Sequence, residues 1–209
     1  MAGQLQTELF MYPRPGGQDL VERICAHATN RPAHHVVAVS VAPTNVAQAS
    51  DLLFGTGIGV VSTIDHLSTD LIDEARRSVA KGATEIALPP IVLDQSATLT
   101  RLRSRLGPVT PVTVHMADTH ERLDVDAAER ALRLGADFVS FAPHAASPTA
   151  CRDIDALLAL AQDLQLGKVK IEAADPSHAA LLQAKALPTM ARLCIPLSAG
   201  SLDVVADDF

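Results

Sequence analysis

Two histidines, His115 and His144, each follow a short apolar segment that is typical of a β-strand. Imidazoles at neighbouring strand ends can act as acid and base near neutral pH. With Glu172 or Asp65 nearby, the same imidazoles could instead hold a divalent metal ion. A purely structural histidine, held by hydrogen bonds at a strand end, is the third reading. The sequence leaves all three open, and we assign no residue as a metal ligand.

A second candidate group is the segment VKIEAAD (169–175), an expected strand in which Lys170 and Glu172, two positions apart, share one face. An amine is nucleophilic only after losing its proton, which burial or a neighbouring cation such as Lys168 favours. A carboxylate beside it favours the ammonium form instead. We therefore expect a Lys170–Glu172 ion pair, with imine chemistry at Lys170 as the alternative.

Further polar residues follow the other expected strands. Asp65 and His66 end the third, and we predict that they contact substrate. Ser140 lies inside the sixth, where its small side chain would leave room for a ligand. Ser198 and Ser201 belong to a loop, SAGS, that could cradle a phosphate. The polar residues expected at one end of the sheet are Asp65, His66, His115, Asp118, His144, Lys170, Glu172 and Asp175. Asp118 and Asp175 also fit helix N-caps.

The elements that would position these residues are eight short β-rich runs separated by helical patterns. The runs are Glu8–Tyr12, Val36–Ala42, Ile58–Asp65, Thr84–Leu88, Thr110–Met116, Asp137–Ala142, Lys168–Ala173 and Ala191–Leu197. Between them lie amphipathic stretches such as LIDEARRSVAKG and DVDAAERALRLG. Strands joined by helices of this length form parallel crossovers.

A weak internal sequence similarity supports a repeated βα unit. KGATEIAL (81–88) and LGADFVSF (134–141) both run from a helix through Gly-Ala into a strand. Eight such units predict one α/β domain over residues 1–209, a (β/α)8 TIM-type barrel, with functional residues at the C-terminal ends of its strands. An open doubly wound sheet is the rival fold. No GxGxxG motif follows the first strand, and GTGIG (55–59) precedes a strand, which indicates a loop.

Composition limits the classes of function. The chain of 209 residues has 48% hydrophobic and 20% charged residues and no apolar run long enough to span a membrane. A net charge of −7 and only six Tyr and Phe residues argue against a nucleic-acid partner. Three widely spaced cysteines and the absence of a signal-like start predict a cytoplasmic protein with buried free thiols.

The segments VAVSVAPTNVAQASDLL (37–53), VVSTID (60–65), KGATEIALPP (81–90), LGADFVSFAPH (134–144) and VKIEAAD (169–175) resemble the deoxyribose-phosphate aldolase family. The resemblance extends over most of the chain and implies the same barrel. It also implies a class I aldolase, in which a strand lysine forms a Schiff base with a sugar-phosphate carbonyl.

The catalytic pattern that this resemblance implies is mostly missing. The position of the reactive lysine falls on Ser140, and that of the catalytic aspartate falls on Ala87. Lys170 matches a second lysine of the family pattern. The family's glycine pair, which helps to hold phosphate, is replaced by Ala173 and Ala174. The resemblance therefore implies the scaffold together with an altered reaction.

The sequence thus predicts an enzyme without a Schiff-base lysine and without a cofactor. We expect His115, His144, Lys170 and Glu172 to be catalytic, in a lyase, isomerase, cyclisation or condensation step on a small carbonyl compound. A non-catalytic relative, acting as a ligand-binding module or partner subunit, is one alternative. A divalent-metal enzyme is the other. For the assembly of this protein we consider a homodimer, because symmetric dimers are common among barrels.

Overall fold

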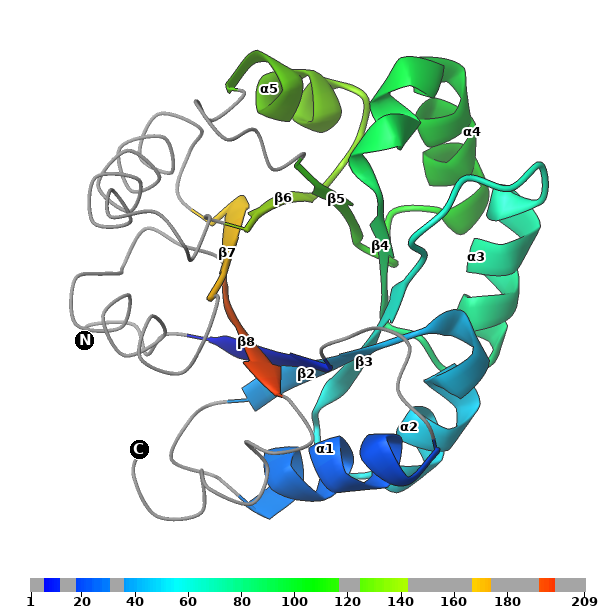
Figure 1. Ribbon diagram of the computed structural model, residues 1–209. Helices are drawn as coiled ribbons and strands as arrows, with labels where there is room; N and C mark the ends of the chain where they lie inside the picture. Colours follow the sequence, from blue (N-terminus) through cyan, green and yellow to red (C-terminus); the bar gives the residue numbers. More distant parts are fainter. Residues whose placement is uncertain are drawn as a thin grey trace.

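Eight parallel strands close into a barrel in the computed structural model, which describes residues 6–11, 18–30, 36–116, 125–142, 167–173 and 192–197. Each strand pairs with its sequence neighbours, and β1 pairs with β8 to complete the ring (Figure 1). The strands are β1 (Thr7–Met11), β2 (Val36–Val41), β3 (Gly59–Thr63), β4 (Glu85–Leu88), β5 (Val112–His115), β6 (Phe138–Phe141), β7 (Val169–Glu172) and β8 (Arg192–Leu197). The predicted TIM-type barrel is confirmed, and all eight predicted strands are present.

Helices lie outside the ring of strands (Figure 1). They are α1 (Gln18–Asn30), α2 (Val46–Leu52), α3 (Leu71–Ala80), α4 (Ser96–Leu106) and α5 (Val125–Arg133), with 3-10 helices η2 (Pro43–Asn45) and η3 (Pro90–Gln95). None of the helices in these ranges is long and apolar enough to cross a lipid bilayer.

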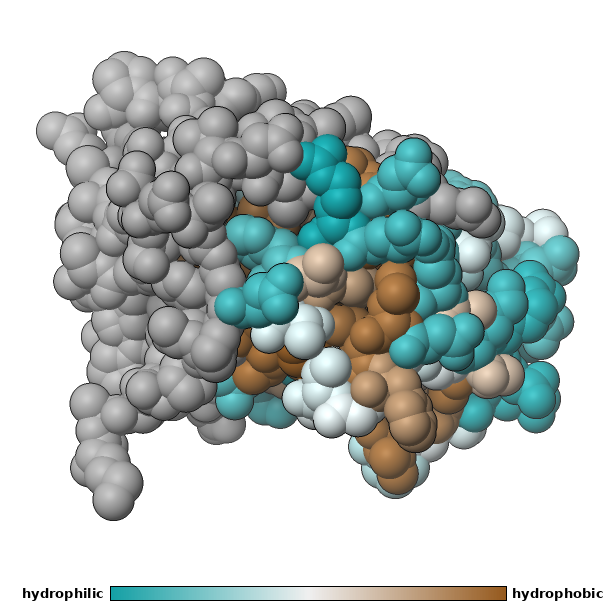
Figure 2. Space-filling view, turned by 90° about the horizontal axis from the view of Figure 1, so that it is seen from below, coloured by the Kyte–Doolittle hydropathy of each residue, from teal (hydrophilic) through white to brown (hydrophobic). Residues whose placement is uncertain are grey.

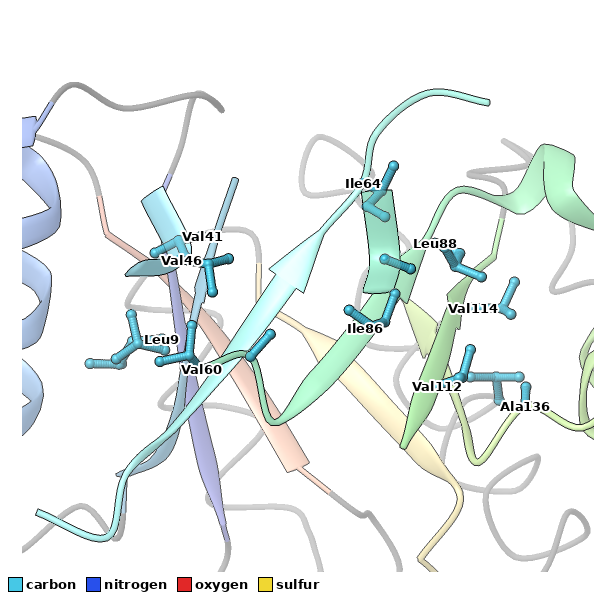
Figure 3. Close-up of a cluster of buried hydrophobic side chains, with 14 of the residues drawn as sticks. Leu9, Val41, Val46, Val60, Ile64, Ile86, Leu88, Val112, Val114 and Ala136 are labelled. Atoms are coloured by element: carbon cyan, nitrogen blue, oxygen red, sulfur yellow. The ribbon is translucent and has the colours of Figure 1, made fainter. Parts of the chain in front are cut away.

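The main hydrophobic core lies between the barrel and these helices, because alternate residues of each strand point outward. Figure 3 shows part of this layer, in which Val60, Ile86 and Val112 extend from successive strands. All three are fully or almost fully buried. A buried valine or isoleucine contributes about 1.5–3 kcal/mol, so this layer holds the helices against the strands.

The two Gly-Ala pairs of the internal sequence similarity, each of which leads from a helix into a strand, are structurally equivalent. In each, the glycine N–H donates to the carbonyl three residues earlier, and the following alanine N–H to the carbonyl five residues earlier. These distances are 3.0 and 3.0 Å at Gly82–Ala83, and 3.1 and 3.0 Å at Gly135–Ala136. The glycines have φ of 103° and 105°, so both α3 and α5 end in a Schellman motif that turns the chain into the next strand.

Candidate functional site

The barrel interior is lined by the residues that alternate with the outward core. Ser62 of β3 donates to Ser78 of α3 at 2.9 Å, which fixes Ser62 as outward and its neighbours Val61 and Thr63 as inward. On the facing side, Glu85 of β4 contacts Lys170 of β7 across the barrel, so both point inward. The inward residues form two polar groups, which lie near opposite ends of the strands.

The first group is a buried charge cluster at the strand starts, made by Glu8, Glu85, Lys170 and Arg192. Lys170 Nζ donates to Glu8 Oε2 at 2.8 Å and also to Glu85 Oε1. Arg192 Nη1 donates to Glu85 Oε2 at 2.7 Å and to Glu8 Oε2 at 3.2 Å. Two carboxylates and two cations therefore neutralise one another inside the barrel.

Burial and charge act in opposite directions on the pKa values of this buried charge cluster. For Lys170, burial would lower the pKa, but the carboxylates of Glu8 and Glu85 outweigh it and raise the pKa above its ordinary value. For Glu85, burial would raise the pKa, but Lys170 and Arg192 lower it overall. The ionised form of each group is thus favoured. An ammonium held in this way is not a nucleophile.

Phe138 of β6 completes the surroundings of this cluster. Its ring centroid lies 5.1 Å from Lys170 Nζ and 5.4 Å from Arg192 Cζ, distances at which a ring face attracts a cation. Thr113 Oγ1 donates to Glu85 Oε1 at 2.6 Å. Glu85 is therefore held by hydrogen bonds as well as by charge.

The predicted ion pair between Lys170 and Glu172 is wrong. The side chain of Lys170 reaches toward the strand starts, where Glu8 and Glu85 bind it. Glu172 lies two residues further along β7, at the C-terminal end, and binds other partners. The raised pKa of Lys170 and its two carboxylates also speak against imine chemistry at this amine.

The second group is a Ser-His-Glu cluster, formed at the C-terminal ends of the strands by Ser140, His115 and Glu172. His115 Nδ1 lies 2.7 Å from Glu172 Oε1, and Ser140 Oγ donates to the same oxygen at 2.9 Å. Ser140 is 1% exposed, and the side chains of His115 and Glu172 are 21% and 14% exposed. His115 Nε2 is buried and has no hydrogen-bond partner among the residues that the structure describes.

This geometry sets the protonation pattern of a neutral imidazole. A carboxylate accepts hydrogen bonds, so the proton of neutral His115 lies on Nδ1, and Nε2 carries a lone pair. Glu172 orients the ring through this contact. Ser140 in turn orients Glu172. The arrangement can accept a proton at Nε2 and return it.

The remaining predicted residues lie elsewhere. Asp65 and His66 are exposed in the loop after β3, on the C-terminal side of that strand. His144, Ser198 and Ser201 lie outside the described residues, as do Asp118 and Asp175. Within the ranges that the structure describes, no group of three histidine, cysteine or acidic side chains could hold a metal ion.

Glu8 and Arg192 were missed by the sequence analysis. Both face the barrel interior near the start of a strand, where alternation in TELFM and RLCIPL already places them inward. A buried glutamate requires a cationic partner, which Lys170 and the partly buried Arg192 supply. Free buried thiols are confirmed for Cys25 and Cys194, and Cys151 lies outside the described residues.

Comparisons with known proteins show the fold. No protein-family model and no curated protein matches the chain. Among solved structures, a candidate deoxyribose-phosphate aldolase from Coccidioides immitis is 18% identical, with a TM-score of 0.68 over 97% of this chain and 84% of that chain. The tetrameric deoxyribose phosphate aldolase of Aeropyrum pernix is 17% identical, with a TM-score of 0.64 over 99% and 91%.

A triosephosphate isomerase from Bartonella henselae has the same TM-score of 0.64 at 13% identity, over 96% of this chain and 94% of that chain. The chain has the barrel fold that deoxyribose-phosphate aldolases share with other TIM-barrel enzymes. At these identities, its reaction must be argued from its own residues.

Proposed function

We propose that this protein is an acid–base enzyme that moves a proton on a small carbonyl compound, with His115 as the base. The observation that carries the proposal is the pairing of His115 Nδ1 with Glu172, while Nε2 is buried and has no partner in the described part of the chain. Buried polar atoms are normally hydrogen-bonded, so an unpaired one calls for an explanation. A substrate atom that exchanges a proton with Nε2 would be the missing partner, which explains why this nitrogen is left unpaired.

In the proposed step, Nε2 takes a proton from the carbon next to the carbonyl group. The electron pair of the broken C–H bond forms a C=C bond, and the carbonyl π electrons move to oxygen to give an enolate. His115 becomes an imidazolium, whose charge Glu172 offsets at 2.7 Å. Return of the proton to the same carbon regenerates the imidazole and gives exchange. In an α-hydroxy carbonyl compound, return to the former carbonyl carbon, with transfer of the α-hydroxyl proton to the former carbonyl oxygen, gives isomerisation. In a β-hydroxy carbonyl compound, Nε2 could instead take the hydroxyl proton: the O–H electron pair then forms a new C=O, the bond between the α and β carbons breaks to give the same enolate, and an aldehyde leaves, which is lyase chemistry.

Covalent imine chemistry has no place in this proposal. Ser140 stands where the resemblance implies the reactive lysine, and it holds the catalytic carboxylate instead. Ala87, where the resemblance implies an aspartate, is buried in a cluster with Ala38 and Val61. Lys170, the remaining lysine of the pattern, is held as an ammonium by Glu8 and Glu85.

The proposal is tested by deuterium exchange. Acetone, hydroxyacetone, dihydroxyacetone and dihydroxyacetone phosphate in D₂O are followed by proton NMR for loss of the signals next to the carbonyl. The wild-type protein should speed exchange of at least one compound. His115→Gln should slow that exchange by roughly 10²–10⁴-fold, the usual contribution of a positioned acid or base. Glu172→Gln should act in the same direction, because a neutral amide cannot offset the charge of the imidazolium.

His27→Gln is the matched control, because His27 lies on α1, outside the barrel. It should exchange at the wild-type rate, and circular dichroism should show that all variants are folded. No exchange by the wild type on any compound, or equal rates for His115→Gln and the wild type, would reject the proposed function. Borohydride with the same ketones should leave the protein mass unchanged.

A homo-oligomer is a further part of the proposal. The Aeropyrum pernix neighbour is tetrameric. Figure 2, seen from the side of α1 and α2, shows hydrophobic residues exposed among hydrophilic ones. At the end of α2, Leu52 is 45% exposed and Phe54, just after it, is 90% exposed. Light scattering should then give at least a dimer, which Phe54→Ser weakens. The cytoplasmic location and the single domain over residues 1–209 stay predictions.

A further inference from the structure

A buried pair of hydroxyl groups lies at the C-terminal ends of β2 and β3. Ser40 Oγ and Thr63 Oγ1 are 2.6 Å apart, and the two residues are 3% and 1% exposed. Thr63 is the last residue of β3, and Ser40 is the last but one of β2. The pair is therefore at the same end of the barrel as His115 and Glu172, which end β5 and β7.

Both hydroxyl groups face the barrel interior. Thr63 pairs in register with Ala87, and Ser40 pairs with Val61. Paired residues of neighbouring strands share a face, and Ala87 lies two residues after the inward Glu85. Ser62, between Val61 and Thr63, points the other way and bonds to α3. The wall made by β2, β3 and β4 thus carries short side chains at this end of the barrel.

The pair retains one hydrogen-bond donor. Two hydroxyl groups carry two protons, and the bond between Ser40 and Thr63 uses one of them. No acceptor for the second proton is found among the described residues. A buried O–H group without an acceptor costs stability, and such groups in native proteins normally meet a partner or a ligand.

The closed order of the strands places this pair opposite the Ser-His-Glu cluster. In a ring of eight strands, β2 faces β6 and β3 faces β7, as Figure 1 shows. Ser40 and Thr63 therefore lie across the barrel from Ser140 and Glu172. An eight-stranded barrel is just wide enough to hold side chains or one small ligand.

We propose that the Ser40–Thr63 pair binds an oxygen of the substrate, which makes the substrate a small hydroxy-carbonyl compound. This inference rests on the proposed function, which places the reacting carbon at His115. The pair donates its free O–H to a hydroxyl oxygen of the substrate that lies across the barrel from that carbon. A ketone without a hydroxyl group would reach only one of the two walls.

Binding, measured apart from catalysis, tests this inference. Dissociation constants of acetone, hydroxyacetone and dihydroxyacetone are measured by ligand-observed NMR with the wild-type protein. One net hydrogen bond amounts to about 0.5–1.5 kcal/mol, so hydroxyacetone should bind roughly 2- to 13-fold more tightly than acetone. The double variant Ser40→Ala with Thr63→Val should bind both ketones alike.

The matched control is the double variant Ser62→Ala with Ser78→Ala. It removes a buried hydroxyl pair of similar length, 2.9 Å, from the outer face of the same strand, and it should keep the wild-type preference. If the interior double variant does not fold, Ser40→Ala and Thr63→Val are tested singly, and each should reduce the preference. A wild type that binds acetone and hydroxyacetone equally overturns the inference, as does an interior variant that keeps the preference.

The acid–base function and the binding role of the Ser40–Thr63 pair can be rejected independently of each other. His115→Gln should lose exchange but keep the preference for hydroxyacetone, because its hydroxyl pair is intact. A preference without any exchange in the wild type would reject the acid–base function and support the binding pair. Exchange that is equally efficient for acetone and hydroxyacetone would support the base and overturn the binding pair.

Discussion

Removing the Lys170 ammonium should destabilise the barrel strongly. Lys170 is 1% exposed and is the partner of two buried carboxylates. Lys170→Met would leave Glu8 and Glu85 with Arg192 alone, so the interior would carry one uncompensated negative charge. Breaking a buried ion pair from one side costs about 3–5 kcal/mol, because the remaining charge stays out of water. We expect a loss of that size in the free energy of unfolding at pH 7.

Urea unfolding followed by far-UV circular dichroism measures this loss, since the chain has no tryptophan to report by fluorescence. Adding Glu85→Gln to Lys170→Met removes the unpaired charge. The double variant should therefore be more stable than the sum of the two single losses by roughly 0.5–3 kcal/mol. Lys168→Met, just before β7 and only half-buried, is the control and should change stability by less than about 0.5 kcal/mol.

Two results would refute the reasoning on this cluster. The first is a loss for Lys170→Met no larger than that for Lys168→Met. The second is strict additivity of Lys170→Met and Glu85→Gln. Either would mean that the four charges do not act as one network, and that Lys170 is free for other chemistry.

Three further predictions concern acidity, the turn after α3, and the Ser-His-Glu cluster. Because the pKa of Glu85 is lowered in the folded protein, its stabilisation is present above the ordinary glutamate pKa of about 4.3 and is lost as pH falls through the folded value. Unfolding curves below pH ~4.3 should thus fall less steeply for Glu85→Gln than for the wild type. Gly82→Ala should cost about 1–3 kcal/mol, since φ is 103° and a Cβ would meet Ser50 Oγ. Gly107→Ala, also at positive φ but with open space around it, should cost less in the same urea assay. Ser140→Ala should slow deuterium exchange roughly 13- to 160-fold, which corresponds to the loss of one hydrogen bond to a charged carboxylate, while leaving substrate affinity unchanged.

The fold could be predicted because two periodicities agree along the whole chain. Runs such as VVAVSV alternate with amphipathic helices, and the glycines that end α3 and α5 stand where a Schellman motif needs them. Alternation also placed Lys170 and Glu172 correctly on one face of their strand. These are local properties, which neighbouring residues determine.

The partners within the barrel could not be predicted in the same way. Alternation says that Lys170 points inward, but it does not say whether its long side chain extends toward the start or the end of the strand. The answer depends on Glu8 and Glu85, which are separated from it by 162 and 85 positions and meet it only when the ring closes. The nearest carboxylate in sequence, Glu172, was for that reason the wrong choice.

The direction of Lys170 also determines what the opposite end of the barrel can do. Had its ammonium extended upward, it would have paired with Glu172, and His115 would have lost the carboxylate that orients it. Two carboxylates near the strand starts keep the ammonium away from that end, and Phe138 attracts it to the same side. Ser140 suits this end of the barrel, because its side chain donates a hydrogen bond to Glu172 without adding a positive charge. A lysine at this position would compete with His115 for the same carboxylate oxygen. The buried charge cluster and the missing lysine are thus two parts of one arrangement, which keeps Glu172 available to the imidazole.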